Sequence, residues 1–138
     1  MKLVRQIQIT KKHHFFEELD NLTFLSKNLY NATLYEVRQQ FFKEKTFLNY
    51  KTINKKFTIE NQQDYRALPA KVSKHTQMLV DKNFKSFFAL LKKKNEGKYD
   101  RPINIPKYLD KIKGRQVIHY EKGALQFSEK GFIKLSKT

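Results

Sequence analysis

The sequence predicts an α+β protein in which a helical lobe is inserted after the first strand of a small, incomplete β-domain. Three observations carry this prediction: an alternating segment at the N-terminus, apolar residues at helical spacing through the middle, and short strand-like segments between glycine turns at the end. The 138 residues suffice for one domain with a buried core. We assign residues 1–12 to the first strand, 13–100 to the helical lobe and 101–138 to a connector and further strands.

The predicted first strand runs from Leu3 to Thr10, where polar side chains alternate with Ile7 and Ile9. The long segment that follows, residues 13–45, contains no Gly or Pro. Its apolar residues recur at spacings of mostly three and four, which predicts one long helix or two stacked helices. Residues 46–64 are more polar and predict a loop that holds one short helix.

The second long helix is predicted from Pro69 to about Lys94. Proline is favoured in the first turn of a helix, and Asn95 and Gly97 provide a stop signal. A broad apolar face includes Val72, Val80 and Phe84, whereas the opposite side carries lysines. These lysines are Lys71, Lys74, Lys82, Lys85 and Lys92.

Beyond the helices, Pro102 and Pro106 lie four residues apart and predict an extended connector. Short strands are predicted at 116–120, 124–127 and 132–135, separated by turns that contain Gly123 and Gly131. Four short strands make a marginal barrel, and the last one has an open edge that could support self-association. We therefore expect the β-domain to be incomplete.

The charge is strongly positive, with 29 Lys and Arg against 13 Asp and Glu and a net charge of +16. Residues 69–138 carry 17 of these basic side chains and 6 acidic ones, a net charge of +11. Nucleic acid is the commonest partner of such a chain, ahead of an anionic membrane or an acidic protein. No segment has the ~18 apolar residues of a membrane span, so we expect a cytoplasmic protein without a membrane partner.

Several kinds of chemistry are excluded or disfavoured by the composition. Cysteine is absent, which removes disulfides, thiolate nucleophiles and cysteine-ligated metals. No two histidines have the spacing that places two metal ligands on one helix face. The scattered carboxylates are interpreted as surface ion-pair partners, so we predict no enzymatic activity, no metal and no cofactor in this chain. The residues concerned are His13, His14, His75, His119, Asp64, Asp81, Asp100 and Asp110.

Three segments in order resemble the N-terminal part of the TnpB (OrfB) family of bacterial insertion sequences, which is related to type V CRISPR effectors. They are the Asn31-containing segment 25–35, the segment 68–73 leading to the D-x-x-F-x-x-F-F pattern at 81–88, and the P-x-x-x-P-x-Y connector at 102–108. The likeness covers essentially the whole chain. It implies a wedge-type β-barrel interrupted by a helical recognition lobe, a fold that agrees with the plan read from the pattern alone.

The resemblance also implies a function, because TnpB proteins are RNA-guided DNA endonucleases. Their RuvC-like nuclease and zinc element would lie beyond residue 138, so we expect a nuclease-less part that binds guide RNA and target-adjacent duplex DNA near the bacterial nucleoid. Four alternatives stay open: a small basic repressor, a subunit completed by a separately encoded RuvC-like half, a structural partner of an anionic membrane, and a remnant without function.

Two groups of residues are the candidate contacts. The beginning of the second long helix is expected to read duplex DNA, and the tail is expected to follow a phosphate backbone or RNA. The duplex-reading group is Lys71, Lys74, His75, Gln77 and Met78, and the backbone-binding group is Arg101, Lys107, Lys111, Lys113 and Arg115.

Overall fold

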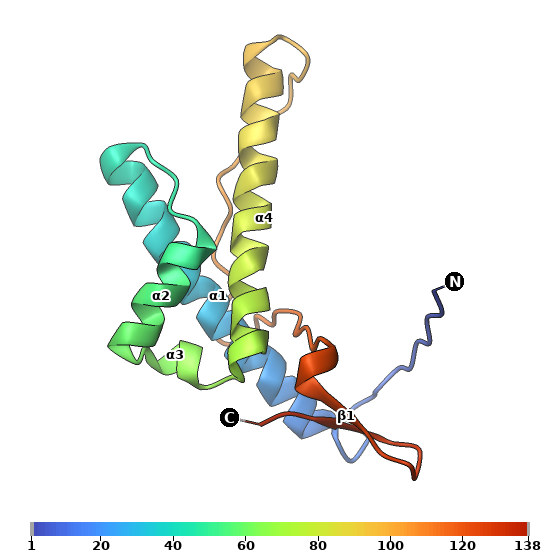
Figure 1. Cartoon of the computed structure of the whole chain (residues 1–138). Coiled ribbons are helices and arrows are strands. Elements are labelled where there is room, and N and C mark those ends of the chain that lie inside the picture. The colour runs from blue at the N-terminus through green and yellow to red at the C-terminus, as the bar shows by residue number, and fades with distance from the viewer. Residues whose placement is uncertain (1, 138) are drawn as a thin grey trace.

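The computed structural model describes residues 2–137 and shows two long helices that cross, with two short helices beside them and a small hairpin near the C-terminus (Figure 1). The helices are α1 (Phe16–Glu44), α2 (Tyr50–Glu60), α3 (Gln63–Arg66) and α4 (Ala70–Asn95). A 3-10 turn, η1 (Lys122–Ala124), leads into strands β1 (Leu125–Phe127) and β2 (Ile133–Leu135). Helices and strands are both present, as the α+β prediction requires.

The first predicted helical segment forms one continuous helix, α1, rather than two stacked ones. Glu17 and Glu18 lie in its first turn, where acidic side chains interact favourably with the helix dipole. The helix ends where Lys45 adopts a left-handed conformation with φ of 55°, and its N–H bonds the Phe41 carbonyl. The predicted short helix is α2, and the Asn49 side chain caps it by accepting a hydrogen bond from the Thr52 N–H.

Helix α4 agrees closely with the prediction. Pro69 is its N-cap, the last helical residue is Asn95, and Gly97 follows with φ of 75°, a conformation that glycine adopts without strain. Three lysines in the last turn, Lys92 to Lys94, suit the negative end of the helix dipole.

The core lies where α1, α2 and α4 meet. Leu34, Val80 and Phe84 are completely buried, and the apolar side of α2 adds Ile53 and Phe57. Each such side chain contributes about 1.5–3 kcal/mol of transfer free energy. The predicted apolar face of α4 is therefore the face that packs in the structure.

Only part of the predicted β-structure forms. The two last strands are present and pair antiparallel, with Leu125 opposite Leu135. Within residues 2–137 the sheet contains no further strand, and its two strands have three residues each. The wedge-type barrel is thus not assembled by these residues.

Two strand predictions are wrong for this structure. Residues 3–10 form no strand; they extend away from the helices, and Leu3 and Val4 are 85% and 93% exposed (Figure 1). Alternation makes a segment suitable for a sheet, but a strand also needs a partner backbone, and neither described strand pairs with residues 3–10. Residues 116–120 form no strand either, because the Gln116 N–H bonds the Thr23 carbonyl of α1 instead.

Candidate nucleic-acid interface

Polar side chains of α1 hold the connector against that helix. Asn31 acts as a clamp: its Nδ2 donates to the Leu109 carbonyl at 3.0 Å, and its Oδ1 accepts from the Leu109 N–H at 2.9 Å. About two turns further along α1, Arg38 donates to the Pro106 carbonyl at 3.0 Å, and its guanidinium lies 4.8 Å from the Tyr108 ring centroid. The connector therefore has a fixed path across the lobe.

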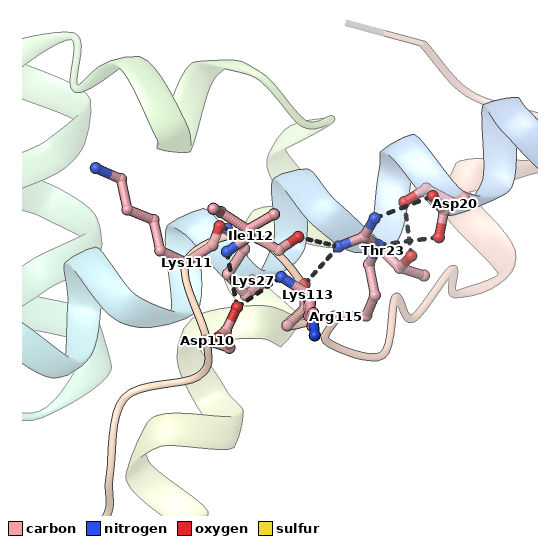
Figure 2. Close-up of polar contacts among 9 residues, drawn as sticks. Asp20, Thr23, Lys27, Asp110, Lys111, Ile112, Lys113 and Arg115 are labelled. Carbon is pink, nitrogen blue, oxygen red and sulfur yellow. Dashed lines mark hydrogen bonds and ion pairs between the residues drawn. The ribbon is translucent and has the colours of Figure 1, made fainter.

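Lys27, four residues before Asn31 on α1, also bonds this segment and is almost fully buried, with 1% of its surface exposed. Its Nζ donates to the Lys111 carbonyl at 2.5 Å and lies 3.8 Å from the centroid of the Phe24 ring (Figure 2). Burial lowers the pKa of Lys27, because the charged form loses hydration, and nearby Arg115 acts in the same direction. A lysine in this position serves the fold and is not available to a ligand.

The predicted backbone-binding residues divide into two classes. Arg115 is engaged within the protein: it pairs with Asp20 through two hydrogen bonds of 2.9 and 3.1 Å and donates to the carbonyls of Ile112 and Gly114 (Figure 2). The hydrogen bond from Arg115 lowers the pKa of Asp20. The Arg115 guanidinium therefore already has a carboxylate partner, and its contact with phosphate stays a prediction.

The other members of that group remain accessible. The Lys111 side chain extends away from the cluster in Figure 2, whereas the N–H groups of Ile112 and Lys113 bond the Asp110 carboxylate. The four exposed side chains are Arg101, Lys107, Lys111 and Lys113.

The predicted duplex-reading group contains one error. Gln77 is completely buried, and its Oε1 accepts a hydrogen bond from Asn54 at 3.0 Å. It lies six residues after Lys71, about 240° around the helix, and so points into the core rather than outward. Gln77 cannot reach a base edge in this structure.

The other members lie on the outer face of α4, where a carboxylate from the C-terminal segment moderates their charge. Glu121 accepts from His75 Nε2 at 3.2 Å and lies 3.8 Å from the Lys71 ammonium. The hydrogen bond from His75, with further help from Lys71 and Lys74, lowers the pKa of Glu121. Met78, 37% exposed, lies on the same face.

This outer face continues along the helix as a row of exposed lysines. We call the row the α4 lysine face; at 100° per residue its members fall within about 100° of one another around the axis. Among residues 2–137 only Lys71 of this row has an ion-pair partner. The α4 lysine face consists of Lys71, Lys74, Lys82, Lys85, Lys92 and Lys93.

An open groove of about 630 Å³ lies beside this face. One wall is α4 from His75 to Ala89, and the other comes from Tyr50 of α2 with Val117 and His119 of the C-terminal segment. We call this cavity the α4 groove. The rings of His75 and His119 stack at 4.1 Å between centroids, so the C-terminal segment is held against α4 at this point.

Asp81 lines the groove and is the least expected of its residues, because we predicted a surface ion-pair partner. It is only 6% exposed, and its Oδ1 has no hydrogen-bond partner. Burial raises the pKa of Asp81, although a hydrogen bond from the Tyr50 backbone and the charge of Lys85 partly offset this effect. In the sequence, Asp81 lies three residues before Phe84 and seven before Phe88, next to the apolar stripe of the helix. This spacing was the one sign that Asp81 would be buried.

Asp81→Asn is expected to raise the melting temperature at pH 7, because the buried carboxylate is costly to ionise and asparagine carries no charge. Since the folded state binds the proton more tightly than the unfolded state, wild-type stability falls as pH rises from 3.8, the ordinary Asp value, through the raised pKa. The gain from Asn should therefore shrink in acid. Thermal melts of both proteins from pH 3.5 to 7.5 measure it, and Asp100→Asn, at an exposed carboxyl, should change little.

Two further observations bear on the class of site. Within residues 2–137, no three His, Asp or Glu side chains gather in a way that could hold a metal ion. Across the same range, every helix is too short or too polar to cross a membrane.

Comparison with protein-family models, with curated proteins and with solved structures finds no match to this chain.

Proposed function

We propose that this chain binds nucleic acid and corresponds to the N-terminal, nuclease-less part of a TnpB-type protein. The observation that carries the binding proposal is the α4 lysine face: six lysines on one side of a helix roughly 39 Å long, with one carboxylate partner among them. Cations along one side of a helix suit a phosphate backbone, with which they interact without reading sequence.

The family part of the proposal rests on three sequence segments in order, and the structure gives two of them a physical role. Asn31 clamps the connector, and the D-x-x-F-x-x-F-F segment supplies Phe84 to the core and Asp81 to the α4 groove. In the proposed function, guide-type RNA and target-adjacent duplex DNA are the ligands, in the cytoplasm of a bacterium. Catalysis is assigned to no residue of this chain.

The test is binding of the full chain to a duplex DNA and to a single-stranded RNA, followed by fluorescence anisotropy across a salt series. We expect affinity for both at low salt, and for duplex DNA a decrease of log K with log salt of about 0.9 per neutralised phosphate. Absence of binding to either ligand at low salt would contradict the proposal. Tighter binding to anionic vesicles than to nucleic acid would indicate instead that the positive surface of the protein contacts a membrane.

A further inference from the structure

Three exposed aromatic rings gather on the side of α1 that carries the connector. Tyr35 and Phe42 lie seven residues apart on the helix, so their side chains point within about 20° of one another around its axis. The connector adds Tyr108, and the three side chains are 54%, 48% and 43% exposed. Burial raises the pKa of Tyr108, and Tyr35 is near enough to add to this shift, although Arg38 opposes it. We call Tyr35, Arg38, Phe42 and Tyr108 the α1 aromatic patch.

The α1 aromatic patch has a fixed shape. The Arg38 guanidinium carbon lies 5.5 Å from the Phe42 ring centroid and 4.8 Å from that of Tyr108, within cation–π distance of both rings. Hydrogen bonds from Arg38 and Asn31 hold the connector backbone on either side of Tyr108. Single exposed apolar side chains are ordinary on a protein surface, whereas rings gathered from two distant segments are typical of a contact site. These rings need little rearrangement to receive a ligand.

The charge around the patch selects the partner. Arg38 donates to one carbonyl and has no carboxylate partner among residues 2–137, so its other N–H groups are open to an anion. Lys107, the residue before Tyr108, is exposed and also has no ion-pair partner in that range. The nearest acidic residue of α1 in the sequence, Glu36, lies about 160° from Arg38 around the helix and pairs with Lys56. The partner should therefore combine negative charge with flat apolar faces.

Nucleic acid fits this description better than a protein does. Phosphates carry the negative charge, and bases have flat faces that stack on aromatic rings and on arginine. An apolar peptide would remove water from the Arg38 guanidinium without replacing its hydrogen bonds, which is costly. A second copy of this chain, with a net charge of +16, would bring like charges together. Because the base faces of a duplex are already stacked, the rings can receive only unpaired bases.

We propose that the α1 aromatic patch is a stacking site for unpaired bases of a single-stranded nucleic acid. The bases stack on the rings of Tyr35, Phe42 and Tyr108. Arg38 and Lys107 contact the adjacent phosphates. This inference rests on the proposed nucleic-acid-binding function and adds to it a site for single strands. The α4 lysine face provides cations alone and suits either form, whereas the α1 aromatic patch distinguishes a single strand from a duplex.

The first test compares a labelled single-stranded RNA of about 12 nucleotides with a duplex DNA of the same length, by fluorescence anisotropy with the full-length chain. Tyr35→Ala with Phe42→Ala should weaken RNA binding about tenfold or more, the loss expected for at least one stacked base, and should leave duplex affinity nearly unchanged. Tyr35→Phe with Phe42→Tyr keeps both rings and should retain RNA binding. The matched control, Phe127→Ala with Phe132→Ala, removes two exposed rings near the C-terminus and should retain it too.

A second measurement reports on stacking directly. The chain contains no tryptophan, so Tyr35→Trp places a single indole in the patch. A base that stacks on an indole quenches its fluorescence, whereas an anion without bases does not. We expect saturable quenching by the single-stranded RNA and none by inorganic polyphosphate of matched charge.

Several outcomes would overturn the inference. They are unchanged RNA affinity in folded Tyr35→Ala with Phe42→Ala, an equal loss of RNA and duplex affinity in that variant, and equal quenching by RNA and polyphosphate. Melting curves establish that the double variant folds; if it does not, the quenching of Tyr35→Trp decides. A dimer in sedimentation that the double variant dissociates would identify the patch as an interface between copies instead. If both nucleic acids bind in the salt series but the ring variants change neither affinity, the stacking site fails and the proposed function stands; if neither nucleic acid binds, both fail.

Discussion

Replacing Lys27 by alanine is expected to lower the free energy of unfolding by about 2–4 kcal/mol, because the change removes a fully buried stem and leaves the Lys111 carbonyl without its donor. The contact with the Phe24 ring is lost as well. Since this lysine joins α1 to the connector, the residues around Lys111 should become accessible to protease. Urea unfolding and limited proteolysis provide the two measurements.

Two companion variants separate the causes of that loss. Lys27→Met keeps most of the stem and removes a charge that burial disfavours, so it should retain most of the stability. Lys43→Ala, at an exposed position on the same helix, is the matched control and should cost little. Equal unfolding midpoints for Lys27→Ala and Lys43→Ala would mean that the buried contact contributes nothing.

The helices were predictable because their physical cause is local. Apolar residues at spacings of three and four, without Gly or Pro, specify a helix and its buried face together, and both long helices form where this pattern predicts. Strand prediction from alternation failed at 3–10, since a strand depends on a partner that the pattern does not supply. The hairpin at 125–135 was predictable because its two strands are close in sequence and the turn is marked by Gly131.

The connector contact could not be predicted in the same way. Lys27 and Asn31 bond backbone groups that lie 84 and 78 residues further along the chain, and a backbone carbonyl leaves no signature in the sequence. The one feature of Lys27 and Asn31 that the sequence does show is a polar residue next to the apolar stripe of a helix. Asp81 has the same feature. Gln77 was a different kind of error, because its angular distance from Lys71 already places it on the core side of α4.

Replacing Lys74, Lys82 and Lys85 together by alanine is expected to reduce affinity for duplex DNA by roughly 100-fold at ~0.1 M salt, and to lower the slope of log K against log salt by about two to three. These three side chains are exposed on the α4 lysine face and have no ion-pair partner within residues 2–137. The measurement is anisotropy with a fixed duplex across the salt series.

The matched control changes the net charge by the same amount on another surface. Lys43→Ala, Lys51→Ala and Lys55→Ala together remove three exposed lysines from α1 and α2. If a diffuse positive charge were responsible for binding, both triple variants would lose the same affinity. We expect the control to retain most of it, because phosphate contacts act over about a Debye length of 8–10 Å.

Glu121→Gln provides the opposite change on the same face. In the wild-type protein the Glu121 carboxylate accepts from His75 and lies beside the Lys71 ammonium. Without this carboxylate, Lys71 is available to bind a phosphate. The variant should therefore bind duplex DNA more tightly, with a slope of log K against log salt that is steeper by about one. Since the Glu121 side chain is 41% exposed and the change to Gln keeps its size, the variant should fold normally. A gain from Glu121→Gln together with a loss from the α4 triple variant would place the bound phosphates along α4. If the two triple variants weaken binding equally and Glu121→Gln changes nothing, the contact surface lies elsewhere and the α4 lysine face is only a solvated side of the helix.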